Sequence, residues 1–141
     1  MAKKYILSFF HLKLPITRND WIAIFAIKTM PYIQFDTRKR IDIWPGISGT
    51  VYHSEQATFG YFDLEAGVVL AEHQHPHEQW THLIEGTLEF NIAGEKKMLK
   101  PGMAAFIPSN TTHSAIAHTA CKVIDCFLPV REEFRALELK D

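Results

Sequence analysis

The sequence predicts an all-β domain, built as an antiparallel sandwich or barrel. Short apolar stretches alternate with turn residues from Ile33 onward, and no long helical pattern interrupts them. The clearest strand is Thr87–Ile92, where Leu88 and Phe90 share one face and polar side chains occupy the other. Aromatic residues make up 12% of the chain, which is consistent with this fold class.

Each predicted strand is bounded by glycine, proline or a short polar link. In chain order the predicted strands are Ile41–Trp44, Gly49–His53, Thr58–Leu64, Gln79–Glu85, Thr87–Ile92, Lys96–Leu99, Met103–Ile107, Ser114–Ala117 and Lys122–Leu128. After them, Phe134 and Leu137 lie at helical spacing, so Arg131–Leu139 is predicted to form a short C-terminal helix.

Length and composition limit what the chain can be. With 141 residues it is long enough for one domain with a substantial core. A formal net charge of −1 argues against nucleic acid as a partner. Cys121 and Cys126 lie an odd number of positions apart, so on one strand they point to opposite faces, which argues against a disulfide between them. Free thiols predict a reducing, cytoplasmic location.

Residues 1–29 differ from the rest of the chain. They carry five basic side chains and one acidic side chain, whereas residues 30–141 carry ten basic and fifteen acidic ones. The apolar runs Tyr5–Phe10 and Trp21–Ile27 are too short to span a bilayer, so no membrane partner is expected. We expect either that Met30 is the true start or that residues 1–29 are a peripheral extension of a domain formed by residues 30–141. The alternative is a membrane-surface or targeting arm.

A cluster of histidines predicts a metal site. His73 and His75 point the same way in an extended chain and can hold one divalent ion. Gln79 has the same parity and can join them, although His77 competes for that place. His113 is the best candidate for a ligand from elsewhere, because it also follows a turn and leads into an apolar run. Imidazole and amide donors suit zinc, nickel, iron, manganese or copper better than magnesium or calcium, and the sequence does not choose among them.

The last predicted strand carries one carboxylate among apolar residues. Asp125 shares a face with Val123 and Phe127, and the opposite face is also apolar, so we expect the strand to be covered on both sides. Burying a carboxylate is costly without a partner. Two roles stay open: an ion pair with Arg131, or a general acid or base facing the interior.

These motifs resemble those of the cupins. Gly67–Gly86 follows the pattern Gly-x5-His-x-His-x3-Gln-x6-Gly and is similar to the first cupin motif. Gly102–His113 is similar to the second, with Asn110 where glycine is usual. The resemblance implies a single-domain antiparallel jelly-roll β-barrel. His82 has the opposite parity from Gln79, so it should point away from the metal. We expect it to pack between the sheets or at a dimer contact.

From about Met30 to Leu137 the chain resembles the pectin-degradation protein (KdgF) family of cupins. The resemblance assigns one divalent transition metal ion to His73, His75, Gln79 and His113, and catalysis to Asp125, Phe127 and Arg131. The implied activity converts 4,5-unsaturated monouronates, released by pectin or alginate lyases, to linear 5-keto-4-deoxyuronates. The chain departs from the family pattern at Cys126, Leu128 and Val130, which bears on the details of substrate fit.

Two other functions compete with this one. A cupin dioxygenase would need redox-active iron or copper, and many such sites carry glutamate at the position of Gln79. A non-catalytic, sugar-binding cupin would leave Asp125 and Arg131 as an ion pair only. The expected partners are a small uronate and, through an apolar sheet face, a second copy of the chain in a homodimer.

Overall fold

The structure is a computed structural model and describes residues 32–140. The predictions for residues 1–29, including the boundary at Met30, lie outside this range and stay predictions. Among residues 32–140 no helix is long and apolar enough to cross a membrane.

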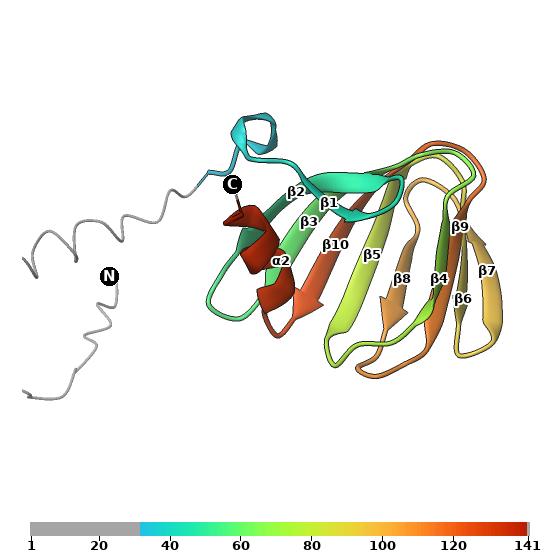
Figure 1. The fold of residues 1–141 in the computed structure, drawn as a ribbon. Coiled ribbons are helices and arrows are strands. Elements are labelled where there is room, and N and C mark those ends of the chain that lie inside the picture. The colour runs from blue at the N-terminus through green and yellow to red at the C-terminus, as the bar shows by residue number, and fades with distance from the viewer. Residues whose placement is uncertain (1–31, 141) are drawn as a thin grey trace, which may run out of the picture. The chain divides into compact units, whose positions relative to one another are not determined.

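Two antiparallel sheets face each other and form the predicted jelly roll (Figure 1). The six-stranded sheet has the order β1-β2-β3-β10-β5-β8, and the four-stranded sheet has the order β4-β9-β6-β7. The elements are η1 (Phe35–Thr37), β1 (Ile41–Trp44), β2 (Ile47–His53), β3 (Thr58–Leu64), β4 (Val69–His73), β5 (Glu78–Glu85), β6 (Leu88–Ile92), β7 (Glu95–Leu99), β8 (Ala104–Ile107), β9 (His113–Ala117), β10 (Cys121–Leu128) and α2 (Glu132–Glu138).

The core lies between the two sheets. Side chains alternate strictly along β3 and β10, with every second residue buried. Phe62, Leu83, Leu88 and Ile107 are among its most deeply buried members. The expectation that β10 is covered on both faces was wrong, because the face that carries Ile124, Cys126 and Leu128 is only half-buried.

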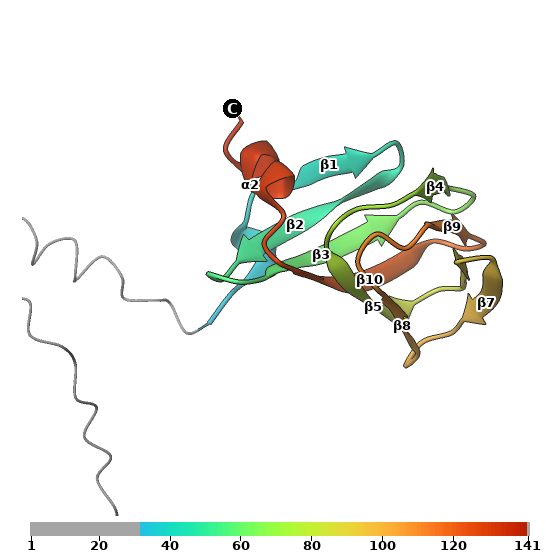
Figure 2. The same cartoon turned by 90° about the horizontal axis from the view of Figure 1, so that it is seen from below.

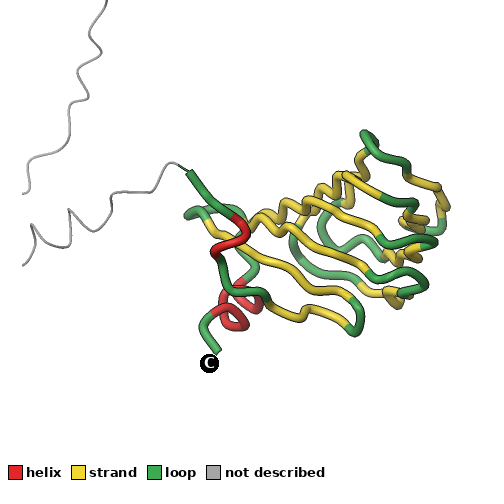
Figure 3. The backbone as a smooth tube through the Cα atoms, turned by 90° about the horizontal axis from the view of Figure 1, so that it is seen from above, coloured by secondary structure: helices red, strands yellow, loops and turns green. Residues whose placement is uncertain are grey.

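The predicted strands all occur, and β3 has the predicted bounds. The structure adds β4, which the sequence had not delimited, and the 3-10 turn η1. Figure 2 shows α2 beside β1 and β2, at one end of the larger sheet. Figure 3 shows that loops join the strands and that helix is confined to η1 and α2 in the described chain.

The outer face of the six-stranded sheet carries exposed apolar side chains, including Trp80, Ile84 and Phe106. His82 is exposed on the same face of β5, so it points away from the histidine cluster as expected, but it is not packed between the sheets. Cys121 is buried and both cysteines are free. The homodimer and the cytoplasmic location stay predictions.

Candidate functional site

A β-bulge brings His73 and His113 together. Strands β4 and β9 pair with a shift of register between Leu70 and His73, which makes His73 the direct cross-strand partner of His113. A bulge adds a residue to one strand and re-aims the side chains that follow it. The two rings lie with their centroids 4.2 Å apart.

His75 reaches the same point from the loop after β4. Its ring centroid lies 5.0 Å from that of His113 and 5.9 Å from that of His73. Asn110 ties this loop to the turn before β9, because its N–H donates to the carbonyl of His75 at 2.8 Å. Asn110 has φ of 58°, a left-handed conformation that explains why glycine is usual there and why asparagine is tolerated.

The three rings leave the same nitrogen free. The Nδ1–H groups of His73, His75 and His113 donate to the carbonyls of Ala71, His77 and Thr111 at 2.8, 2.9 and 2.8 Å, respectively. Such bonds fix the tautomer and turn the Nε2 lone pair outward. One ligand atom from each ring lies within 4.8 Å of the others. The histidine cluster is therefore positioned to bind a metal ion.

The side chain of Gln79 lies against the histidine cluster. Its Oε1 lies 3.0 Å from His75 Nε2, and its own amide group donates to Thr81 Oγ1 at 2.8 Å. An amide oxygen held against an unprotonated imidazole nitrogen suits a cation between the two acceptors. In addition, the buried Nε2 of His113 has no hydrogen-bond partner among residues 32–140. These observations fit a divalent transition metal and leave its identity open.

Burial keeps the rings of His75 and His113 neutral. Burial, assisted by the charge of Arg131, lowers the pKa of His75 to about 4. Burial also lowers the pKa of His113. A metal ion entering the site therefore does not have to displace protons from these two rings near neutral pH. His77 lies beside the cluster, with its ring centroid 5.6 Å from that of His75.

Asp125 faces inward from β10, as its parity predicted. It is 8% exposed and pairs with Thr81 across the β5–β10 ladder. Gln79 donates to its Oδ2 at 3.4 Å, and Oδ1 is buried with no partner in the described chain. Burial raises the pKa of Asp125 to about 7, opposed by a hydrogen bond from Thr81 and by the charge of Arg131.

Arg131 does not form the ion pair with Asp125 that was one of the two expectations. Its Nε and Nη2 both lie 2.7 Å from Oε1 of Glu133. The guanidinium carbon lies 4.8 Å from the ring centroid of Phe127 and 4.2 Å from that of Phe134. Aromatic faces attract a guanidinium, so the group is held in a fixed plane.

One cavity of about 320 Å³ unites these groups. His73, Gln79, Asp125 and Arg131 line its polar side, and Phe127 lies among them. Its apolar side comes from Ile43, Trp44, Ile47, Leu70 and Leu137. We call this space the inner cavity. A pocket of this size, with few polar groups converging on one side, suits a single small ligand.

Sequence reasoning missed two supporting residues. Thr81 orients the amide of Gln79. Its position two residues after Gln79 on the same strand could have indicated this contact from the sequence. Glu133 holds the guanidinium of Arg131, and nothing in the pattern singled it out from Glu132.

Comparisons with known proteins identify the fold and the family of the chain. A cupin domain model matches residues 60–127. The structure of KdgF from Halomonas sp. is 32% identical, with a TM-score of 0.68, over 72% of this chain and 99% of that one. An RmlC-like cupin from Shewanella frigidimarina NCIMB 400 is 26% identical, with a TM-score of 0.70, over 74% and 95% of the two chains.

A more distant similarity extends to DMSP lyase DddQ from Ruegeria pomeroyi DSS-3, which is 25% identical with a TM-score of 0.51. That match covers 53% of this chain and 39% of the other. Comparison with curated proteins gave no match. The chain belongs to the cupin family, and within it to the KdgF-like type.

Proposed function

We propose that this cupin is a metal-dependent enzyme that converts 4,5-unsaturated monouronates to linear 5-keto-4-deoxyuronates. The observation that carries the proposal is the convergence of three groups on the inner cavity. These are the histidine cluster, which reaches the cavity through His73, together with Gln79, the carboxyl group of Asp125 and the guanidinium of Arg131. The similarity to KdgF from Halomonas sp. supports the same choice.

The reaction is an isomerisation and needs no second substrate. The ring form carries a hemiacetal hydroxyl on C1 and an enol ether between the ring oxygen and the C4–C5 double bond. Loss of the C1 hydroxyl proton forms the C1 carbonyl and breaks the bond from C1 to the ring oxygen. The resulting enolate collapses to a C5 ketone as C4 takes up a proton. In net terms one proton moves from oxygen to carbon.

Asp125 is suited to carry this proton. A carboxyl group with a pKa of about 7 can accept the hydroxyl proton and donate it to C4 at comparable cost. Its Oδ1 has no hydrogen-bond partner in the described chain, and Asp125 lines the inner cavity. Asp125 therefore acts as the general base and then the general acid.

Arg131 and Phe127 bind and orient the sugar. The planar guanidinium matches the two oxygens of the substrate carboxylate, and its position over aromatic rings restricts its rotation. Phe127 provides an apolar wall against the ring. His73, His75 and His113, with Gln79, would hold a divalent cation, which would supply Lewis acidity to the negative charge that develops on substrate oxygen.

One assay tests the proposal. The protein is incubated with unsaturated monouronate generated by a pectin lyase or an alginate lyase, and the ultraviolet absorbance of the conjugated double bond is followed while oxygen is monitored. Loss of absorbance without oxygen uptake is the expected result. Oxygen uptake would indicate a dioxygenase, and no change in either signal would indicate a binding module. Running both substrates also shows which epimer is preferred.

A further inference from the structure

The main-chain N–H of Arg131 is held by a side chain from another strand. Arg131 precedes α2, and its carbonyl accepts the first helical bonds, from Phe134 and Arg135. Its own N–H has no partner within the helix. Thr58 of β3 supplies one, because its Oγ1 accepts this N–H at 2.9 Å. Thr58 is fully buried.

The same hydroxyl bonds to His53. Thr58 Oγ1 and His53 Nδ1 lie 2.8 Å apart and belong to residues paired directly across β2 and β3. His53 Nε2 faces the carboxylate of Glu138 at 3.6 Å, which favours a proton on Nε2. Nδ1 is then the acceptor of the Thr58 hydroxyl proton. The bonds from Arg131 through Thr58 to His53 therefore run in one direction and strengthen each other.

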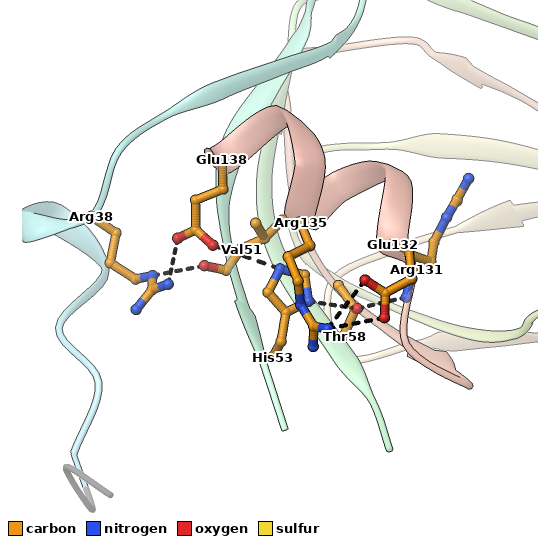
Figure 4. A network of polar contacts seen from close by, with 8 residues as sticks. All are labelled: Arg38, Val51, His53, Thr58, Arg131, Glu132, Arg135 and Glu138. Atoms are coloured by element: carbon orange, nitrogen blue, oxygen red, sulfur yellow. Dashed lines mark hydrogen bonds and ion pairs between the residues drawn. The ribbon is translucent and has the colours of Figure 1, made fainter. Parts of the chain in front are cut away.

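Glu138 is fixed in turn by the segment before β1. Arg38 forms an ion pair with Glu138, and its Nε donates to the carbonyl of Val51 at 2.7 Å. Figure 4 shows this network of polar contacts, with Thr58 between His53 and Arg131. The network thus connects the segment before β1, the β2–β3 hairpin and the helix α2.

The side chain of Arg131 extends away from this anchor. In Figure 4 its main-chain nitrogen meets Thr58 while its guanidinium lies on the far side of the residue. The guanidinium lines the inner cavity. Thr58 also pairs directly with Phe127 across the β3–β10 ladder, so one residue neighbours both Arg131 and the ring beneath its guanidinium.

We propose that Thr58 is a positioning residue that sets where the guanidinium of Arg131 meets the substrate carboxylate. The proposal rests on the substrate-binding role proposed for Arg131. Burial alone does not explain a threonine at this position. Thr50 is also buried in the same sheet, and its hydroxyl has no hydrogen-bond partner among residues 32–140. The hydroxyl of Thr58, by contrast, uses both its donor and its acceptor capacity.

Thr58→Val keeps the shape of the side chain and removes the hydroxyl. We expect it to raise KM for unsaturated monouronate about tenfold and to change kcat by less than about twofold, because a displaced clamp weakens binding in the ground state and transition state alike. Thr58→Ser should restore KM, and Thr50→Val should behave like the wild type. Metal content should be equal in all four proteins. A loss of folded protein would instead lower the apparent kcat and leave KM unchanged.

A measurement without substrate separates this proposal from the proposed function. The Nε–H of Arg131, bonded to Glu133 in the structure, can be followed by NMR as it exchanges with solvent, with Arg131→Lys used to assign its signal. Thr58→Val should accelerate this exchange about tenfold, while Thr50→Val should not. If the wild type fails to convert unsaturated monouronate but this pattern holds, the proposed function fails, while the anchoring of the Arg131 guanidinium by Thr58 stands. Unchanged exchange in Thr58→Val, or equal acceleration in Thr50→Val, would overturn the proposal.

Discussion

Asparagine at position 125 should change how the stability of the metal-free protein depends on pH. Burial raises the pKa of Asp125 from 3.8 to about 7, so the folded protein keeps a proton that the unfolded chain releases at lower pH. The stability from this proton is fully present below the unfolded pKa. It is lost as the pH rises through the folded pKa.

The structure sets the size of the effect. A shift of about three pKa units corresponds to about 4 kcal/mol in all. Integration of the linkage relation places about 2.5 kcal/mol of this loss between about pH 5 and pH 8. Asp125→Asn removes the titrating group and keeps the shape of the side chain. The free energy of unfolding of the wild type, minus that of the variant, should therefore fall by about 2.5 kcal/mol over this range.

Urea unfolding of chelator-treated protein at several pH values measures this difference. All other ionisable groups are the same in the two proteins, so their contributions cancel in the subtraction. Asp63→Asn, at a more exposed carboxylate paired with Arg40, shows what the loss of a surface charge does. A difference between wild type and Asp125→Asn that stays constant within about 0.5 kcal/mol would refute the reasoning, because Asp125 would not then hold a proton in the folded state. With metal present, the same variant should lose at least about a hundredfold in turnover.

Three further substitutions test separate parts of the account. His113→Ala should weaken metal binding by more than about a hundredfold, measured by metal titration, and binding at wild-type strength would remove His113 from the ligand set. Arg131→Lys keeps the charge but loses the planar fork of the guanidinium, so KM should rise at least about tenfold with metal content unchanged. Arg135→Lys, in α2, is the control. Gly86→Ala should lower the free energy of unfolding, measured in urea, by at least about 2 kcal/mol more than Gly94→Ala. Both glycines have positive φ, but of the two only Gly86 would place a new Cβ against backbone, 2.3 Å from the carbonyl oxygen of Ala120. Equal losses would contradict the close packing at Gly86.

Local patterns were sufficient for the strands and for the direction of their side chains. The bounds of β3 and the inward position of Asp125 follow from alternation along the chain, which needs no knowledge of neighbouring strands. The convergence of His73, His75 and His113 was expected from the two motifs, and the structure brings them together.

The remaining features depend on contacts between distant segments. The bulge before His73 is a property of the pairing of β4 with β9, and no residue in β4 marks it. An ion pair of Arg131 with Asp125 was one of the two expectations, but the turn into α2 places Glu133 against the guanidinium. The second face of β10 is apolar in sequence but only half-buried in the structure. Apolar composition alone does not show whether another element covers a strand, so the sequence could not predict this.

Removing and returning the metal tests whether turnover depends on a metal ion at the histidine cluster. The absorbance of unsaturated monouronate is followed with protein stripped by a chelator, and again after stoichiometric addition of zinc, nickel, iron or manganese. We expect that stripping abolishes turnover and that at least one of these ions restores it, while His113→Ala stays inactive under the same conditions. Full turnover by the stripped protein would contradict the account.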